Sequence, residues 1–472
     1  MRRASSPPLF SSSPLLLVLL LAVLLAACAS AQTETGYTVL THPDGPLYAG
    51  DRISFEVLPG AAATGGLSLQ VSADGTTLGA SGFGPYGVGG RNEAVFWWTW
   101  DTRGLEPGRH TLTFSILPQG PSWTETYVLH PAASVPAPEP DAGWTSTTSG
   151  CCTIYYVTGT DAARDIESLK LLADEQAADV ESDFGAAFPA PVTITFLPRT
   201  LGHGGFASDS IYVSYLDRNY AGSTTAQVVH HELAHIMDAQ LGGGYKPSVL
   251  VEGLAVYISG GHFKEEPLLP RAAALFDLGW YIPLADLADD FYPQQHEVGY
   301  LEAGALVQYL VETYGWDAFD NFYRHLPDPA TVSGADPGPA SPSEALDAAL
   351  REHFGVSLAD LETNFTAALR SQAVTDNVRD DLRLTVRFYD AVRRYQQGLD
   401  PSAYFLTAWL PDGKTMRDLG IVADYLRHPN GWKNRLVEPL LVRADAELRA
   451  GEYTQVEKTL DQAGWLLDLV AP

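Results

Sequence analysis

The sequence is poor in cysteine, in basic residues and in long apolar runs, and each shortage excludes a class of protein. Three cysteines in 472 residues are too few for a disulfide framework or a cysteine-based metal site. Lys and Arg number 29 against 57 Asp and Glu, a net charge of −28. Because nucleic-acid affinity comes mainly from Lys and Arg on phosphates, we expect no nucleic-acid partner. Beyond residue 27 no apolar run is long enough to cross a membrane. We interpret most of the acidic residues as solvated surface.

The first 31 residues have the pattern of an export signal. Arg2 and Arg3 precede an uncharged apolar stretch over 15–27, which is too short to span a bilayer as a helix. Residues 25–28 read Leu-Ala-Ala-Cys, which is similar to the lipobox of bacterial lipoproteins, and this resemblance implies lipidation at Cys28. The alternative is cleavage after Ala-Ser-Ala at 29–31, which would release a secreted protein. We favour a cell-envelope lipoprotein on the outer face of a bacterial membrane, in contact with the membrane only through this anchor.

The two remaining cysteines, Cys151 and Cys152, are adjacent. An exported protein can form a bond between them, but a disulfide between neighbours closes only through a tight ring. We therefore favour two small buried residues at the start of a strand, with the bonded pair as the alternative.

Turn residues and apolar segments divide the rest of the chain into four parts. Residues 32–131 alternate short apolar runs with Gly and Pro turns, which predicts a small β-sandwich. Within it, 53–57 and 110–116 alternate apolar and polar residues, so each should have one polar face. Residues 98–110 resemble the late strands of a bacterial immunoglobulin-like domain. Residues 132–144 contain three prolines and predict a stiff extended linker. Residues 145–372 alternate strands and helices, and 373–472 are typical of helices.

A helix is predicted between Thr224, which with Gln227 fits a capping box, and the stop at glycines 242–244. His231 and His235 stand at i and i+4 in it, so both imidazoles leave one face and can bind one metal ion. Glu232 lies one step around the helix, where its carboxylate can serve as a general base toward a water molecule.

A second helix is predicted over 247–260, with Glu252 as its one ionisable acid. A carboxylate buried in so apolar a run is costly without a partner, and a metal ion offsets that cost. Glu252 is therefore the candidate for the third ligand, which leaves one position of a tetrahedral zinc site open.

The residues His231-Glu232-Leu233-Ala234-His235, followed by Glu-Gly-Leu-Ala-Val-Tyr at 252–257, resemble the gluzincin metallopeptidases. This group contains thermolysin and the aminopeptidase-N-like enzymes, and the sequence looks most like the bacterial domains called peptidase MA-like. The resemblance covers about 151–370. It implies a zincin-type α/β domain and Glu252 as a ligand of Zn²⁺, so we predict a multidomain α+β protein: sandwich, peptidase domain and C-terminal helical extension.

The same resemblance implies further site residues. Gly204, Gly205, Phe206 and Ala207 are similar to the edge strand that holds an extended peptide substrate. Residues 300–310 resemble the helix that presents a Tyr hydroxyl to the oxyanion, which makes Tyr300 the candidate donor and His296 the alternative.

Other polar residues near the motif have less support. Glu265 and Glu266 are candidates for holding a substrate amine, and His203 and His230 are interpreted as surface or satisfied core histidines.

We predict zinc-dependent hydrolysis of a peptide or protein substrate, and the oligomeric state stays open. The alternative is a non-enzymatic envelope protein that keeps a zincin scaffold and binds a partner.

Overall fold

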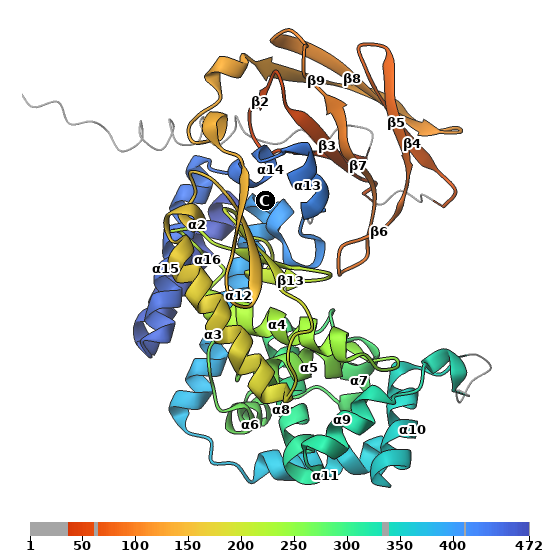
Figure 1. Ribbon diagram of the computed structural model, residues 1–472, viewed down its shortest axis with the longest axis vertical. Coiled ribbons are helices and arrows are strands. Elements are labelled where there is room, and N and C mark those ends of the chain that lie inside the picture. The colour runs from red at the N-terminus through yellow and green to blue at the C-terminus, as the bar shows by residue number, and fades with distance from the viewer. Residues whose placement is uncertain (1–35, 61–64, 333–338, 410–411, 472) are drawn as a thin grey trace, which may run out of the picture.

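The computed structural model describes residues 36–60, 65–332, 339–409 and 412–471. The export signal and Cys28 fall outside the described residues. Figure 1 shows sheets at one end of the molecule, helices at the other, and the end of the chain packed between the sheets and the middle of the molecule. Within the part described, no helix is both long and apolar enough to span a membrane.

The region predicted as a sandwich consists of two sheets with one core between them. Phe55 and Trp100 of one sheet meet Val71 and Phe114 of the other in this core. The first sheet has the order β1 (Thr38–His42), β3 (Arg52–Leu58), β7 (Arg91–Asp101), β6 (Gly84–Tyr86). The second has the order β2 (Leu47–Tyr48), β9 (Ser122–His130), β8 (Gly108–Leu117), β4 (Ser68–Ala73), β5 (Thr76–Gly82).

Strand β3 differs from its predicted alternation, because its polar face is buried as well. Ser54 and Glu56 are both fully buried. Glu56 accepts a hydrogen bond from Arg91 at 3.1 Å and lies 2.9 Å from His42 Nε2. The His42 ring stacks on Trp409 near the end of the chain, with ring centroids 3.9 Å apart. This face of the sandwich is therefore covered by the C-terminal region instead of solvent.

The linker is not extended throughout as predicted. It contains two turns of 3-10 helix, η1 (Ala132–Ser134) and η2 (Glu139–Asp141), and a proline precedes each turn. The second turn is fixed by an ion pair, since Arg427 donates hydrogen bonds to Glu139 and also to Asp51 of the sandwich. The linker is thus packed against the C-terminal region.

A five-stranded mixed sheet occupies the middle of the molecule. Its order is β10 (Trp144–Thr148), β11 (Cys152–Val157), β12 (Val192–Leu197), β14 (Ile211–Ser214), β13 (Gly205–Ala207). The strands β11, β12 and β14 run parallel, while β10 and β13 pair antiparallel at the two edges. Helices α2 (Asp161–Arg164) and α3 (Ile166–Phe184) connect β11 to β12. At the start of β11, Cys151 and Cys152 are bonded, contrary to the reading that we favoured.

A layer of helices follows the sheet. The two helices predicted around the histidine motif are α4 (Thr225–Leu241) and α5 (Ser248–Ile258). Thr224 caps α4 by accepting from the Gln227 backbone, but the Gln227 side chain donates to the carbonyls of Ser259 and Gly261 instead of closing a capping box. The remaining helices are α6 (Leu268–Leu278), α7 (Leu284–Asp289), α8 (His296–Tyr314), α9 (Trp316–Arg324), α10 (Pro342–Phe354) and α11 (Leu358–Arg370), with a 3-10 turn η3 (Pro329–Thr331) before α10.

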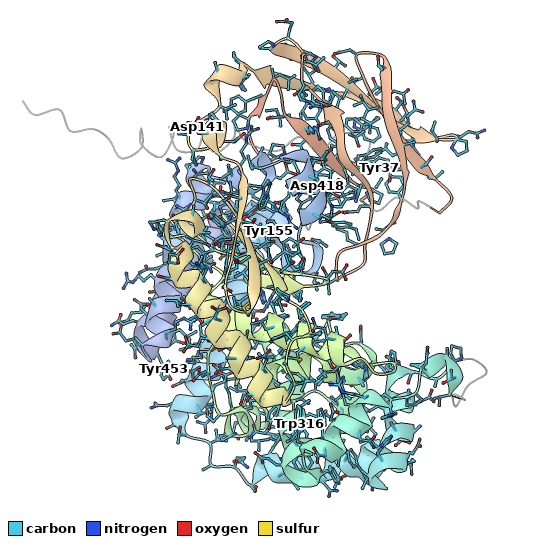
Figure 2. The ribbon with its side chains drawn as sticks, in the orientation of Figure 1. Tyr37, Asp141, Tyr155, Trp316, Asp418 and Tyr453 are labelled. Carbon is cyan, nitrogen blue, oxygen red and sulfur yellow. A yellow bond between two sulfur atoms is a disulfide. The ribbon has the colours of Figure 1, made fainter. Side chains whose placement is uncertain are left out.

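Three long helices of the C-terminal region, α12 (Asp376–Leu399), α15 (Trp432–Arg449) and α16 (Tyr453–Val470), share their own core. Between α12 and α15 the chain returns to the sandwich through η4 (Pro401–Ala403), η5 (Phe405–Thr407), α13 (Gly413–Leu419) and α14 (Ala423–Leu426). Figure 2 labels Asp418 of α13 between Tyr37 of the sandwich and Tyr155 of the central sheet. This returning segment was not predicted.

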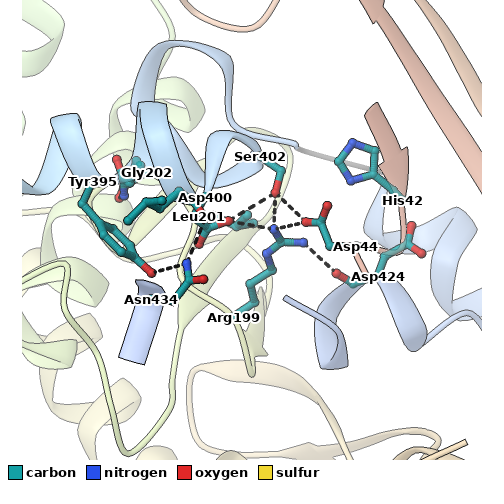
Figure 3. A network of polar contacts seen from close by, with 12 residues as sticks. His42, Asp44, Arg199, Leu201, Gly202, Tyr395, Asp400, Ser402, Asp424 and Asn434 are labelled. Atoms are coloured by element: carbon teal, nitrogen blue, oxygen red, sulfur yellow. Dashed lines mark hydrogen bonds and ion pairs between the residues drawn. The ribbon is translucent and has the colours of Figure 1, made fainter. Parts of the chain in front are cut away.

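A buried arginine joins the three parts of the molecule (Figure 3). Arg199, in the loop after β12, is 1% exposed. It donates hydrogen bonds to Asp44 before β2 at 2.9 Å, to Asp400 after α12 at 3.2 Å and to the backbone carbonyl of Asp424 at 3.0 Å. The loop that leads from β12 to β13 is therefore fixed by both the sandwich and the C-terminal region.

Candidate metal centre and the pocket around it

Three side chains from two neighbouring helices converge on one point. His231 Nε2 and His235 Nε2, on α4, lie 3.1 Å apart. Glu252 Oε2, on α5, lies 3.5 Å from the first and 3.3 Å from the second. A tetrahedral zinc ion with bonds of about 2.0–2.1 Å requires neighbouring ligand atoms about 3.3 Å apart. The three donor atoms thus have the separations and the chemistry of a zinc site with one open position, so zinc fits the residues present.

The negative charge of Glu252 faces both imidazoles of the triad. Burial disfavours the charged form of each of the three groups. At His235 and Glu252 the attraction between the opposite charges is stronger than this effect. Glu252 raises the pKa of His235 to about 9, and the two imidazoles hold the pKa of Glu252 well below its usual 4.5. For His231 burial dominates and its pKa is lowered. One carboxylate and one basic imidazole therefore face the position that a metal would take.

Glu232 lies beside the triad on the same helix. It is 6% exposed, and burial raises its pKa to about 7. The edge strand passes close above it: a Cβ on Gly205 would lie 2.4 Å from Val228 Cγ1 and 3.6 Å from Glu232 Oε1. A glycine at 205 is required for this approach. A carboxyl group with a pKa near neutrality, next to a metal site and under a strand, is suited to accept and return a proton.

Helix α8 and the segment before it contribute the two predicted oxyanion donors and one residue that was not predicted. His296 and Tyr300 stand one turn apart on α8, with ring centroids 4.1 Å apart, and both line the pocket. Burial and the nearby Glu252 carboxylate raise the pKa of Tyr300 well above 10, so its hydroxyl remains a donor. Tyr292, which precedes α8, donates a hydrogen bond of 2.9 Å to Glu252 Oε1. A hydrogen bond from a neighbouring side chain fixes the orientation of a candidate metal ligand in this way.

The edge strand lies along the same pocket. Gly205, Phe206 and Ala207 form β13, the last strand of the sheet, and all three line the pocket. Gly204 directly precedes the strand. Strand β13 pairs with β14 on one side, and no second partner strand is found in the described part of the chain. Its outer edge is thus available to an extended backbone.

Two distant segments complete the pocket. Val88, in the hairpin between β6 and β7, and Phe405 of η5 both line it. The two segments touch, since the backbone amide of Gly89 donates 2.8 Å to the carbonyl of Leu406. A Cβ on Gly87, which has φ of 69°, would lie 2.5 Å from the same carbonyl oxygen. The sandwich and the C-terminal region together therefore form one wall.

The pocket also contains two histidines that sequence reasoning did not place there. His203 was interpreted as a surface or satisfied core residue, which is wrong: it lines the pocket, and both of its ring nitrogens are buried without a partner among the described residues. His262, in the turn after α5, stacks on Tyr300 with centroids 4.2 Å apart. The one sequence signal for His262 is its position directly after the double glycine that ends the Glu252 helix.

Other candidates lie elsewhere. Glu265 and Glu266 line a different cavity, together with His230, and Glu266 is paired with Arg271 at 2.7 Å. His230 Nδ1 is 2.9 Å from Gln176 Oε1, while its Nε2 is buried with no hydrogen-bond partner among the described residues, so this half-buried histidine is only partly satisfied. The acidic residues were interpreted as mostly solvated; a dozen of those described are buried, among them Glu56, Glu297 and Asp381, which are paired with arginines.

Comparisons with known proteins add little. No protein-family model matches the chain, and neither does any curated protein. Among solved structures, the chain is similar to an aminopeptidase N family protein from Idiomarina loihiensis, with 9% identity and a TM-score of 0.28 over 71% of this chain and 77% of that one. The functional interpretation therefore depends on the geometry of the site.

Proposed function

We propose that the protein is a zinc metallopeptidase that hydrolyses peptide bonds in the pocket between α4, α8 and β13. One observation carries this proposal: the donor atoms of His231, His235 and Glu252 lie 3.1–3.5 Å from one another. These are the separations of three corners of a zinc tetrahedron. The pocket adds a buried carboxyl group, two candidate donors and a strand edge, which is the set that amide hydrolysis needs.

Each residue has a part in the reaction. His231, His235 and Glu252 would hold a zinc ion, which would supply the Lewis acid that lowers the pKa of a water molecule and polarises a carbonyl. Glu232 accepts the proton of the attacking water and returns it to the leaving amine. Tyr300 or His296 donates a hydrogen bond to the oxyanion. The free edge of β13 pairs with the substrate backbone and aligns it.

A non-enzymatic scaffold that keeps the fold is the second candidate. A structural zinc site has four protein ligands, whereas the cluster found in the described part of the chain has three. A buried Glu232 with a raised pKa also has no part in a purely structural site. Both observations support the peptidase over the scaffold.

The full chain loaded with zinc and its Glu232→Gln variant test the proposal. We expect about one zinc per chain in both, and a loss of about 10²–10⁴-fold in peptide hydrolysis in the variant. Mass spectrometry of a digested peptide library gives the rate, and the cut positions separate an endopeptidase from an exopeptidase.

Glu302→Gln is the matched control. Glu302 is a fully buried glutamate on α8 whose pKa is also raised, but it accepts from the Ile282 backbone and is absent from the pocket lining. We expect this variant to stay active. Full activity in Glu232→Gln would contradict the proposed mechanism.

We also propose that the protein is exported and anchored through a lipid on Cys28. Cells fed a labelled fatty acid should transfer the label to the wild type and not to Cys28→Ala. Release of the unlabelled wild type into the medium would favour the secreted alternative.

A further inference from the structure

Three histidines outside the metal triad line the same pocket, and we call them the histidine wall: His203, His262 and His296. They come from the loop before β13, the turn after α5 and the first turn of α8. Their ring centroids lie 4.2 Å apart for His203 and His296, 4.9 Å for His262 and His296, and 6.4 Å for His203 and His262. The three rings therefore form one continuous polar surface.

Most ring nitrogens of the histidine wall lack a hydrogen-bond partner in the described part of the chain. His203 Nδ1 and Nε2, His262 Nδ1 and His296 Nε2 are buried and have no hydrogen-bond partner among the residues described. The rings are held by aromatic contacts instead: Phe405 lies 5.1 Å from His203 and 4.3 Å from His296, and Tyr300 stacks on His262. Since buried polar groups in folded proteins nearly always have a partner, four such atoms in one pocket wall point to a ligand.

The charges around the wall favour an anionic ligand over a metal ion. The nearest carboxylate, Glu297, lies 4.0 Å from His203 and is neutralised by Arg393, which donates two hydrogen bonds to it at 3.0 and 2.9 Å. Arg393 also binds Asp390, whose charge is largely screened because that side chain is 59% exposed. Burial lowers the pKa of His203 and His296, with Arg393 among the further causes. These rings thus offer neutral N–H groups, and the carboxylate nearest to them is already paired with an arginine.

The His262 end of the histidine wall lies close to the metal triad. The His262 ring is 5.5 Å from the ring of the metal ligand His231, and His296 is the next ring outward. Consecutive Cα atoms of a peptide are 3.8 Å apart. A group bound at the wall therefore belongs to the substrate residue next to the bond that is held at the metal.

We propose that the histidine wall binds a carboxylate of the substrate and makes the enzyme selective for peptides that carry one about a residue from the cleaved bond. This inference rests on the proposed peptidase function, since it names the substrate class of that site. The imidazole N–H groups donate to the carboxylate oxygens, and such bonds to an ion are stronger than neutral ones. With His296 in this role, Tyr300 is the oxyanion donor. The carboxylate can be the C-terminus of a short peptide or an acidic side chain beside the cleaved bond.

Matched peptides test the proposal on the zinc-loaded full chain. One N-blocked peptide ends in a free carboxylate, a second in the amide, and a third is the amide with Asp in place of Asn next to the cleaved bond. We expect kcat/KM for one of the two carboxylate peptides to exceed that of the neutral amide by about 10–100-fold, as for hydrogen bonds to charged groups. Which of the two is preferred identifies the source of the carboxylate.

Variants assign that preference to the wall. His203→Phe keeps a ring of similar size without nitrogens, and we expect it to bring the ratio near one by slowing the carboxylate peptide more than the neutral amide. His203→Asn restores an N–H donor and should recover part of the ratio. The matched control is His428→Phe, because His428 is partly buried with an unpartnered Nδ1 but lines another cavity.

Each contrary result has a distinct meaning. Equal cleavage of all three peptides by the wild type would overturn the carboxylate proposal and leave the peptidase standing. Two zinc ions per chain, reduced to one by His203→Phe, would make the wall a metal site instead. If no peptide is cut by the zinc-loaded wild type, the proposed function itself fails.

Discussion

Two clusters of the same composition, two imidazoles and one glutamate, lie at the pocket, and they differ in what binds the glutamate. In the metal triad, Glu252 faces His231 and His235 and receives one neutral hydrogen bond from Tyr292. In the second cluster, His203 and His296 lie near Glu297, but Arg393 donates a hydrogen bond to each of the two carboxylate oxygens of Glu297.

The difference shows that ligand types and proximity alone do not define a metal site. A carboxylate attracts a metal only if its charge is not already compensated, and a guanidinium is always charged and matches a carboxylate with two parallel bonds. By this charge balance the same two residue types favour a cation at the triad beside Glu232 and an anion at the histidine wall. Whether the glutamate is free for a metal ion or is paired with an arginine decides which kind of ligand each cluster binds.

The largest expected effect comes from removing the arginine. Arg393→Met leaves Glu297 buried without its partner, and breaking a buried pair in this way costs about 3–5 kcal/mol. We expect added zinc to recover part of this loss, because Glu297, His203 and His296 can then act as a second metal site. Thermal unfolding with and without excess zinc, together with metal content, measures both effects.

The wild type is the reference for this variant. Its second cluster should take up no zinc, so excess zinc beyond one ion per chain should leave its Tm unchanged. A variant that is destabilised but gains nothing from zinc would mean that Arg393 has a structural part only, and that the charge argument is wrong.

The next effect is on the metal triad itself. Glu252→Gln keeps the size of the side chain but removes the negative charge that faces the metal. We expect zinc affinity to fall by more than the about 10–100-fold that is typical when a residue that only hydrogen-bonds a metal ligand is changed. Competition with a chelator of known affinity measures it, and Glu302→Gln serves again as the control. Unchanged affinity would show that Glu252 is not a ligand.

The metal triad could be predicted from the sequence and the wall could not, for a physical reason. His231, Glu232 and His235 lie on one helix, where the spacing along the chain fixes the direction of each side chain. Glu252 is the one acid of the next helix. These four positions follow from local structure, and local structure follows from capping residues, glycines and apolar periodicity.

The wall depends on contacts between residues far apart in sequence. His203 is in a loop whose position is set by the amide of Gly202 bonded to the Ala403 carbonyl and by Gln396 bonded to the Gly202 carbonyl. Phe405, which covers His203 and His296, belongs to the segment between α12 and α15 that no pattern predicted. The same limit explains β3, because the C-terminal region that covers its polar face is distant from it in the sequence.

The smallest expected effect is a proton count that distinguishes the two clusters before any substrate is present. Glu252 raises the pKa of His235 to about 9 in the metal-free triad, so His235 carries a proton at pH 7.0. A histidine must be neutral to bind a metal. Zinc binding should therefore release about one proton at pH 7.0, and affinity should rise with pH until the pH passes about 9. His203 and His296, whose pKa values lie well below 6.5, have no proton to release.

Calorimetry of zinc binding in buffers of different ionisation enthalpy gives this number. The Glu232→Gln variant is the suitable protein, because the pKa of Glu232 is about 7 and its own proton would otherwise be counted. With Arg393→Met added, the imidazoles of the second cluster should release no proton to the second zinc ion, so any proton released with that ion comes from Glu297, whose pKa burial raises. Release of no proton by the first ion would mean that His235 is neutral in the free protein, and that Glu252 does not hold the charge on which the contrast between the two clusters depends.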